Sequence, residues 1–147
     1  MIRRTHRGFT LIELLIVIVI VGILAAAAVG LFLSSKKDAY ATEAKGVAGQ
    51  IKAALETSYQ KNSGLTNMPG TVANLATYGY ITAAAALNGS YYQSTDYTWT
   101  SAAAQFDAVG RYIGTVTVAA RSPAPAVVVT YNSGSKPTVT IDGVAEP

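Results

Sequence analysis

The chain contains no cysteine and a single histidine, His6. Without cysteine the fold has no disulfide, so its stability must come from packing and hydrogen bonds. A mature chain lacking the first residues would also have no histidine, which excludes Cys/His zinc sites, Ser-His-Asp triads and Cys-His nucleophiles. Asp96 and Asp107 could form a carboxylate pair, but lone acids in loops are usually solvated. The sequence therefore predicts no catalytic residue, metal or cofactor, and a protein that is not an enzyme.

Charged residues are scarce as well, at 13% of the 147 residues. Three of the 11 Lys and Arg residues, Arg3, Arg4 and Arg7, lie in the first eight positions without an acid. The remaining eight basic residues face eight Asp and Glu, so a chain without this leader would be nearly neutral. Nucleic acid is therefore a conceivable partner that composition does not indicate. The length fits one globular domain with an appendage.

The apolar residues are concentrated near the N-terminus. Leu14 to Leu33 is a run of 20 residues without a charge or a proline. As a helix it would be ~30 Å long, which is the thickness of the hydrocarbon core of a bilayer. By the positive-inside rule, the arginines before it would keep the N-terminus in the cytoplasm. We therefore expect a single-pass membrane segment with the rest of the chain outside the cytoplasm.

Glu13 is a charged residue within the apolar stretch, with leucine or isoleucine on both sides. An ionised group inside a membrane helix costs roughly 2–3 kcal/mol on insertion scales. Two interpretations stay open. Glu13 could reach the headgroups and complement the positive helix N-terminus, which would stabilise the helix by ~0.3–1 kcal/mol. Alternatively, it awaits a cation in another subunit, most simply a new N-terminal amine created by cleavage nearby.

The segment from Arg7 to Leu14, Arg-Gly-Phe-Thr-Leu-Ile-Glu-Leu, resembles the processing site of type IV prepilins and pseudopilins. The resemblance rests on a short basic leader ending in Gly8, an aromatic Phe9, Glu13 four positions further on, and an uncharged apolar helix. It implies that a membrane prepilin peptidase cuts after Gly8 and methylates the amine of Phe9. It also implies that Glu13 sets the register of subunits in a filament, by pairing with the Phe9 amine of a neighbour.

An ordinary secretory signal is the main alternative for this region. Residues 1–8 would be its basic part, Leu14 to Leu24 its apolar part, and Ala25 to Ala28 its cleavage site. This interpretation leaves Glu13 unexplained and discards the apolar residues from Val29 onward.

An amphipathic helix continues the apolar one without a break. Its apolar residues recur at spacings of three and four, and they are Tyr40, Ala44, Val47, Ile51, Leu55 and Tyr59. Charged residues occupy the other positions and are expected to face outward, with Lys52 and Glu56 at a supportive i, i+4 spacing. The sequence predicts one helix from about Thr10 to Asn62, with a protruding first half and a second half that forms the spine of a head.

Gly22 and Gly30 flank the part of the apolar half that is expected to be least stable as a helix. Each glycine weakens a helix interior by up to ~1 kcal/mol relative to alanine. Small residues here could permit close helix packing. The resemblance implies a second role, because this stretch loses helical order in some assembled filaments. Many family members have proline where Gly30 stands, and this departure makes local melting a weaker expectation.

The remainder of the chain predicts a small β-rich head. A loop follows Asn62 and runs toward residue 90, with one helical turn at Ala83 to Leu87. Four runs read as strands, and they are Tyr97 to Thr100, Tyr112 to Ala120, Ala126 to Tyr131 and Pro137 to Ile141. Residues 132–135 form a hairpin turn between the last two. Several aromatic residues precede or lie within these runs and are expected to be mostly core, namely Tyr78, Tyr80, Tyr91, Tyr92, Tyr97 and Trp99.

The expected architecture is therefore α+β, with a long N-terminal helix packed on a small antiparallel sheet. Its parts are a cleaved leader (1–8), a transmembrane and filament-core helix (9–33), an amphipathic spine helix (34–62) and a globular head (63–147). The resemblance implies a type IV pilus subunit, stored in the inner membrane and polymerised into an extracellular homo-oligomeric filament for adhesion, twitching motility or DNA uptake. Its partners would be prepilin peptidase and the pilus assembly machinery.

Two alternatives to this function stay open. A minor pilin, or a pseudopilin of a type II secretion or DNA-uptake machine, would share every N-terminal feature. A single-span anchored binding module would never polymerise. Several major pseudopilins bind calcium near their C-termini, so a head poor in acids favours a pilus subunit.

Overall fold

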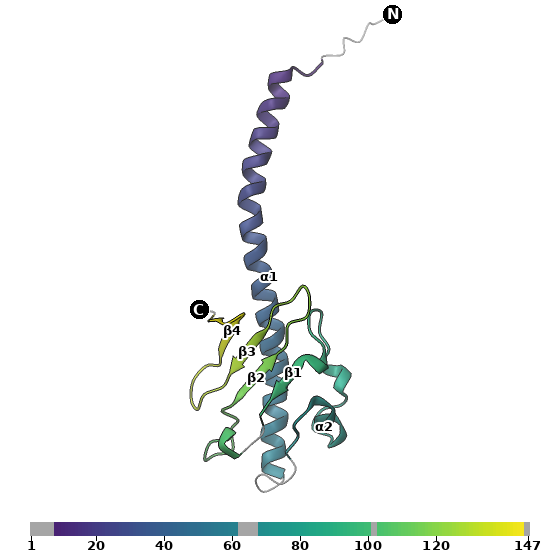
Figure 1. The fold of residues 1–147 in the computed structure, drawn as a ribbon, viewed down its shortest axis with the longest axis vertical. Coiled ribbons are helices and arrows are strands. Elements are labelled where there is room, and N and C mark those ends of the chain that lie inside the picture. The colour runs from purple at the N-terminus through teal and green to yellow at the C-terminus, as the bar shows by residue number, and fades with distance from the viewer. Residues whose placement is uncertain (1–7, 62–67, 101–102, 146–147) are drawn as a thin grey trace, which may run out of the picture. The chain divides into compact units, whose positions relative to one another are not determined.

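The computed structural model describes residues 8–61, 68–100 and 103–145, and the chain divides between Lys36 and Lys37 into two units. A single long helix, α1, passes through both units (Figure 1). The elements in chain order are α1 (Leu11–Lys61), α2 (Val72–Thr77), the 3-10 turns at Ala84–Leu87, Ser94–Asp96 and Ala103–Gln105, and the strands β1 (Tyr97–Trp99), β2 (Thr115–Val118), β3 (Val127–Thr130), β4 (Thr138–Ile141) and β5 (Val144–Ala145).

The second half of α1 buries the predicted stripe. Its buried residues are Tyr40, Ala44, Val47, Ala48, Ile51, Ala54, Leu55 and Ser58. Their spacing of three or four residues keeps them on one side of a helix with 3.6 residues per turn. They join the strands in one apolar core, so the amphipathic spine is confirmed.

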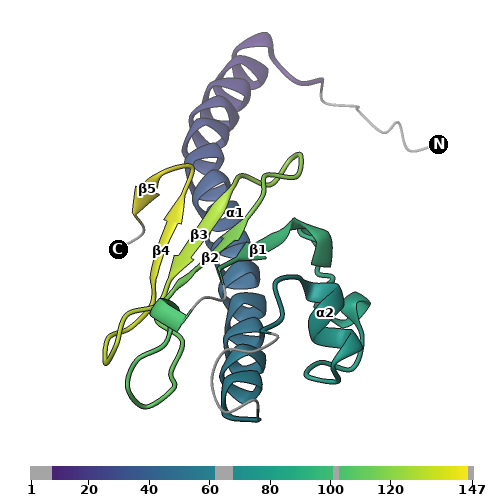
Figure 2. The ribbon, with the colours of Figure 1, turned by 60° about the horizontal axis from the view of Figure 1, so that its bottom comes forward.

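The five strands form an antiparallel sheet in the order β1-β2-β3-β4-β5, so every strand pairs with its neighbour in sequence (Figure 2). Val116, Val129 and Val139 lie opposite one another in the register of β2, β3 and β4, and all three are buried. Alternate residues of β2, β3 and β4 therefore pack toward the core that also contains the α1 stripe. The predicted α+β fold, with a long helix packed on an antiparallel sheet, is confirmed.

Three details of the head differ from the sequence expectation. The segment expected to be loop contains α2, which Thr71 caps by accepting a hydrogen bond from the backbone N–H of Asn74 at 3.2 Å. The second strand is shorter than residues 112–120. A fifth strand, β5, extends the sheet edge. These elements have two to six residues, too few for a periodic pattern to stand out.

Glu43 does not face outward as expected. It is partly buried at the edge of the α1 stripe, and its carboxylate accepts hydrogen bonds from the backbone N–H groups of Ser90 (2.9 Å), Tyr91 (2.9 Å) and Tyr92 (2.8 Å). The outward expectation was wrong because it treated all charged positions as solvated, whereas residues beside a buried stripe can reach the loops packed on it. Glu43 thus fastens the 90–92 segment to the spine.

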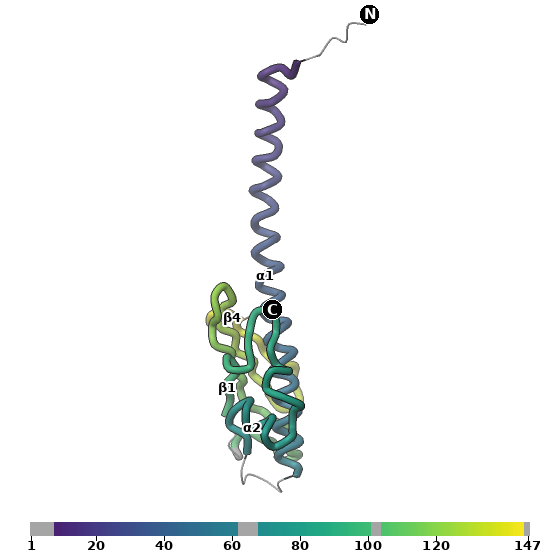
Figure 3. The backbone as a smooth tube through the Cα atoms, turned by 90° about the vertical axis from the view of Figure 1, so that its right-hand side faces the viewer, coloured from purple at the N-terminus to yellow at the C-terminus, as the bar shows by residue number. Residues whose placement is uncertain are grey.

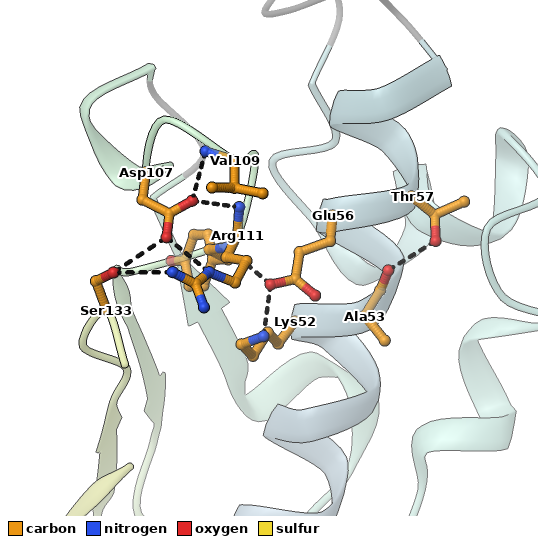
Figure 4. Close-up of polar contacts among 9 residues, drawn as sticks. Lys52, Ala53, Glu56, Thr57, Asp107, Val109, Arg111 and Ser133 are labelled. Carbon is orange, nitrogen blue, oxygen red and sulfur yellow. Dashed lines mark hydrogen bonds and ion pairs between the residues drawn. The ribbon is translucent and has the colours of Figure 1, made fainter. Parts of the chain in front are cut away.

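Glu56 repeats this arrangement further along α1. Its carboxylate accepts a hydrogen bond from the backbone N–H of Tyr112 at 2.9 Å and forms an ion pair with Lys52 (Figure 4). The predicted pair of Lys52 and Glu56 is confirmed. Glu56, however, also holds the segment before β2 against the helix, which the sequence pattern does not indicate.

Asp96 and Asp107 do not form a carboxylate pair, because each binds its own arginine. Asp96 accepts two hydrogen bonds from Arg121, at 2.6 and 3.0 Å. Asp107 accepts one from Nε of Arg111 at 2.7 Å and one from the hydroxyl of Ser133 at 3.1 Å. The Arg121 guanidinium lowers the pKa of Asp96, and hydrogen bonds led by the backbone N–H of Arg111 lower the pKa of Asp107 to about 2. Both acids therefore stabilise turns of the head.

The aromatic residues of the head are mostly core, as expected. Tyr92 and Tyr97 are buried, and Tyr80, Tyr91 and Trp99 are partly buried against the core. Tyr78 is half exposed.

Candidate assembly site

The predicted cleavage junction lies just before the first turn of α1. Gly8, Phe9 and Thr10 form no regular secondary structure, and all three are exposed, with Phe9 at 85%. An added Cβ at Gly8 would have no neighbour within 4 Å. The packing of this chain therefore does not itself require glycine at position 8. The rest of the leader, with Arg3, Arg4, His6 and Arg7, lies outside the described residues.

Thr10 and Glu13 cap the N-terminus of α1 reciprocally. Oε2 of Glu13 accepts hydrogen bonds from the backbone N–H of Thr10 at 2.9 Å and from its hydroxyl at 2.7 Å. The hydroxyl oxygen of Thr10 in turn accepts the backbone N–H of Glu13 at 3.3 Å. This arrangement is a capping box. Two backbone N–H groups that have no partner within the helix each donate to the side chain of the other residue.

The sequence contains the signal of this capping box, a threonine followed three residues later by a glutamate before an apolar run, but Thr10 was not among the predicted site residues. The cap engages Oε2, and among the described residues Oε1 of Glu13 has no hydrogen bond. One carboxylate can therefore cap its own helix and still present an oxygen to a cation from another molecule.

The surface of α1 from Leu11 to Leu33 is exposed and almost wholly apolar. Its large side chains, such as Ile16, Leu24 and Phe32, are at least half exposed. Within the described residues, α1 is the helix long and apolar enough to cross a membrane by length and composition. Such a surface is unfavourable in water and requires lipid or other apolar helices around it.

Gly22 and Gly30 lie within α1, which continues through both positions without a break (Figure 3). An added Cβ at either glycine would meet nothing within 4 Å. Contacts within this chain therefore give no reason for glycine at either position, so a close approach would have to come from another molecule. The loss of helical order between them on polymerisation stays a prediction.

Metal and cofactor sites were not expected, and the described residues contain no group of three or more His, Cys, Asp or Glu side chains that could hold a metal ion. Glu146, the last acid of the chain, lies outside the described residues. The N-terminal segment therefore combines an exposed apolar helix with one acid, Glu13, in its first turn and the predicted cleavage junction before it.

The comparisons with known proteins include a match in this segment. Residues 3–29 match the family model described as the prokaryotic N-terminal methylation motif. The chain is 50% identical over 54 residues to type II secretion system core protein G of Pseudomonas aeruginosa, across 37% of this chain and 38% of that protein. It is 35% identical over 94 residues to fimbrial protein EcpC of Eikenella corrodens, across 64% of this chain and 56% of that one. No solved structure matches the chain significantly.

These matches show what the chain is similar to. It resembles type IV pilin-like proteins, with the N-terminal methylation motif at residues 3–29 and an apolar first half of α1 before an α+β head. The alignments span about four tenths and about half of the two relatives' own lengths.

Proposed function

We propose that this chain is a structural subunit of a type IV pilus. In this proposal prepilin peptidase cuts after Gly8, the new amine of Phe9 is methylated, and the mature chains polymerise through α1 into an extracellular filament. The observation that carries the proposal is the N-terminal methylation motif at residues 3–29, together with the exposed apolar surface of α1 from Leu11 to Leu33. The role is structural and not catalytic.

The proposed assembly step moves α1 from lipid into a bundle of neighbouring α1 helices. The apolar surface from Leu11 to Leu33 is suited to both environments, because lipid tails and leucine side chains are equally apolar. Glu13 favours the second environment. Its free Oε1 can accept the protonated Phe9 amine of a neighbour, and a charge pair costs less in a low-dielectric medium than a lone carboxylate.

A pseudopilin of a secretion machine is a second candidate, favoured by the 50% identity to type II secretion system core protein G. The longer alignment is with a fimbrial protein, and this supports the pilus proposal. Adhesion, motility and DNA uptake are candidate tasks of the filament.

The test is intact-mass and N-terminal analysis of filaments sheared from cells that express the chain. We expect abundant filaments whose subunit begins with N-methylated Phe9. Chains beginning near Val29 would identify an ordinary signal peptide instead. Processing after Gly8 without sheared filaments would favour the pseudopilin, and an unprocessed chain would favour an anchored binding module.

A further inference from the structure

A hollow of about 280 Å³ lies in the head between α1, the segment before β2 and the turn that joins β3 to β4. The residues that line it include Lys52, Arg111, Tyr131, Asn132, Ser133 and Ser135. Its volume is close to the lower end of the ~300–1,000 Å³ of small-molecule sites. The size therefore suits one monosaccharide unit.

The charges around the hollow are arranged in two layers. Lys52 and Arg111 line it, and its described lining contains no Asp or Glu. The acids that pair with them, Glu56 and Asp107, do not line the hollow. Figure 4 shows Lys52 and Glu56 on α1 beside the cluster of Asp107, Arg111 and Ser133. A ligand in the hollow thus meets cations first, which favours an anion.

Both cations are held in place before any ligand binds. Glu56, which binds Lys52, is fixed by the backbone N–H of Tyr112 at 2.9 Å. Arg111 donates Nε to Asp107 at 2.7 Å and Nη2 to Ser133 at 3.2 Å. The described hydrogen bonds leave its Nη1 for a ligand. Because these side chains are already ordered, a ligand loses less conformational entropy in binding them.

Tyr131 gives a second indication that a polar ligand belongs here. The residue lines the hollow and is only 7% exposed, and its buried hydroxyl has no hydrogen-bond partner among the described residues. Burial, with smaller contributions from Tyr112 and Glu56, raises the pKa of Tyr131 to about 12, so the hydroxyl is a donor. A buried donor without a partner is unfavourable. Lys52 lies over the ring, with Nζ 5.8 Å from its centroid, so the cation and the tyrosine lie together at the hollow.

The other polar groups define the rest of the ligand. Asn132 and Ser135 can both donate and accept hydrogen bonds, which matches the hydroxyl groups of a sugar better than a bare inorganic anion. Ser133, whose hydroxyl already donates to Asp107, can still accept one. We propose that this hollow binds a carboxylated monosaccharide unit of the uronic acid class, with Lys52 and Arg111 contacting the carboxylate and the 132–135 turn contacting the hydroxyls. The choice of ligand rests on the proposed function in one respect, which is that the head of an extracellular pilus would meet such sugars in polysaccharides.

The test uses the full-length, ¹⁵N-labelled chain in detergent micelles and follows its backbone amides by NMR. Sodium D-glucuronate is titrated into one sample and D-glucose with matched sodium chloride into another. The two sugars differ only in that glucuronate has a carboxylate where glucose has a CH₂OH group. We expect saturable shifts of the amides of residues 111–113 and 131–135 with glucuronate. Glucose should bind at least about tenfold more weakly, as expected for the loss of a charged hydrogen-bonded group.

Two variants and one control sharpen the test. Lys52→Met should weaken glucuronate binding about tenfold. Tyr131→Phe should weaken it about threefold, because it removes only the hydroxyl. Tyr97→Phe is the matched control, since Tyr97 also has a buried hydroxyl without a described partner but lines a different hollow. The Tyr97→Phe variant should leave the affinity for glucuronate unchanged. The NMR spectrum of each variant shows whether that variant is folded.

Three results would overturn the proposal. They are the absence of saturable shifts in the 111–113 and 131–135 segments, equal affinity for glucose and glucuronate, and unchanged affinity in the folded Lys52→Met variant. Water alone would then fill the hollow. Because the subunit is measured in micelles, the outcome is independent of filament formation, and a failed pilus assignment would be seen separately in the shearing experiment.

Discussion

The carboxylate of Glu43 accepts a hydrogen bond from the backbone N–H of Tyr92 at 2.8 Å, across 49 positions of sequence. The same carboxylate binds the N–H groups of Ser90 and Tyr91. A charged side chain of the spine therefore provides hydrogen-bond acceptors for three consecutive backbone groups of a loop that has no strand to pair with. The loop depends on the helix for its conformation.

The first prediction concerns this contact. Glu43→Ala should destabilise the head by about 2 kcal/mol, because three backbone donors lose a charged acceptor. Urea unfolding of the chain in micelles, followed by near-ultraviolet circular dichroism of the tyrosines, would measure the loss. Lys45→Ala, on the exposed side of the same helix, is the control and should change the stability by less than about 0.5 kcal/mol. Equal effects of the two variants would contradict the prediction.

The second prediction couples Glu43 to Gly89. A Cβ at position 89 would overlap the Glu43 carboxylate and push it away from the loop. Gly89→Ala should therefore destabilise the head in the native background and have little effect when Glu43 is already alanine. The double-mutant cycle should give a coupling of about 1 kcal/mol or more. Additive effects would show that Gly89 is needed for another reason.

The third prediction concerns acid stability at Asp107. Hydrogen bonds, led by that from the backbone N–H of Arg111, lower the pKa of this acid from an ordinary 3.8 to about 2. Because the folded-state pKa lies below the unfolded one, its contribution to stability is present above pH ~4 and is lost as the pH falls toward ~2. Asp107→Asn should therefore be less stable than the native chain at pH 7, and the two unfolding curves should converge near pH 2. A difference that persists unchanged to pH 2 would contradict this assignment.

The sequence predicted most of the architecture because its signals were periodic or strongly biased. The spine stripe from Tyr40 to Leu55 repeats every three or four residues, and the strands alternate around valine and threonine. The Glu43 contact could not be predicted, since it depends on which loop passes beside the helix. The six residues of α2 carry no such pattern. At the candidate site, Glu13 stood out by its charge, whereas Thr10 was not singled out, although the spacing of the Thr10 and Glu13 pair before an apolar run is that of a capping box.

The fourth prediction separates the two roles of Glu13. Glu13→Val should be inserted in the membrane and processed but incorporated poorly into filaments, because an unpaired Phe9 ammonium in an apolar bundle costs about 3–5 kcal/mol. Glu13→Gln is the matched variant. Glutamine can still complete the cap with Thr10 but carries no charge, so it should assemble as poorly as valine. The yield of sheared filaments beside the membrane pool measures both. Normal yield from Glu13→Gln with loss in Glu13→Val would mean that capping, not charge pairing, is what assembly requires.

The fifth prediction concerns Gly8. Gly8→Arg should leave a full-length precursor in the membrane and no filaments, because a peptidase that binds extended backbone at the cleavage point tolerates little there. Since a Cβ at Gly8 meets no atom of the described residues within 4 Å, the fold should be unaffected, and near-ultraviolet circular dichroism of the precursor should match that of the native chain. Normal processing of this variant would move the cleavage site elsewhere.

The passage of α1 through both units also sets the order in which the chain can fold during synthesis. The helix that supplies one side of the head core is made first, and the last long strand, β4, ends 80 residues after α1 does. At ~5–20 residues per second the buried stripe waits roughly 4–16 s for its sheet. The sheet itself is joined only between sequence neighbours, so each strand can pair as soon as it emerges. A chain whose synthesis stops before β3 would therefore have a complete α1 with an uncovered apolar stripe, a form prone to aggregation.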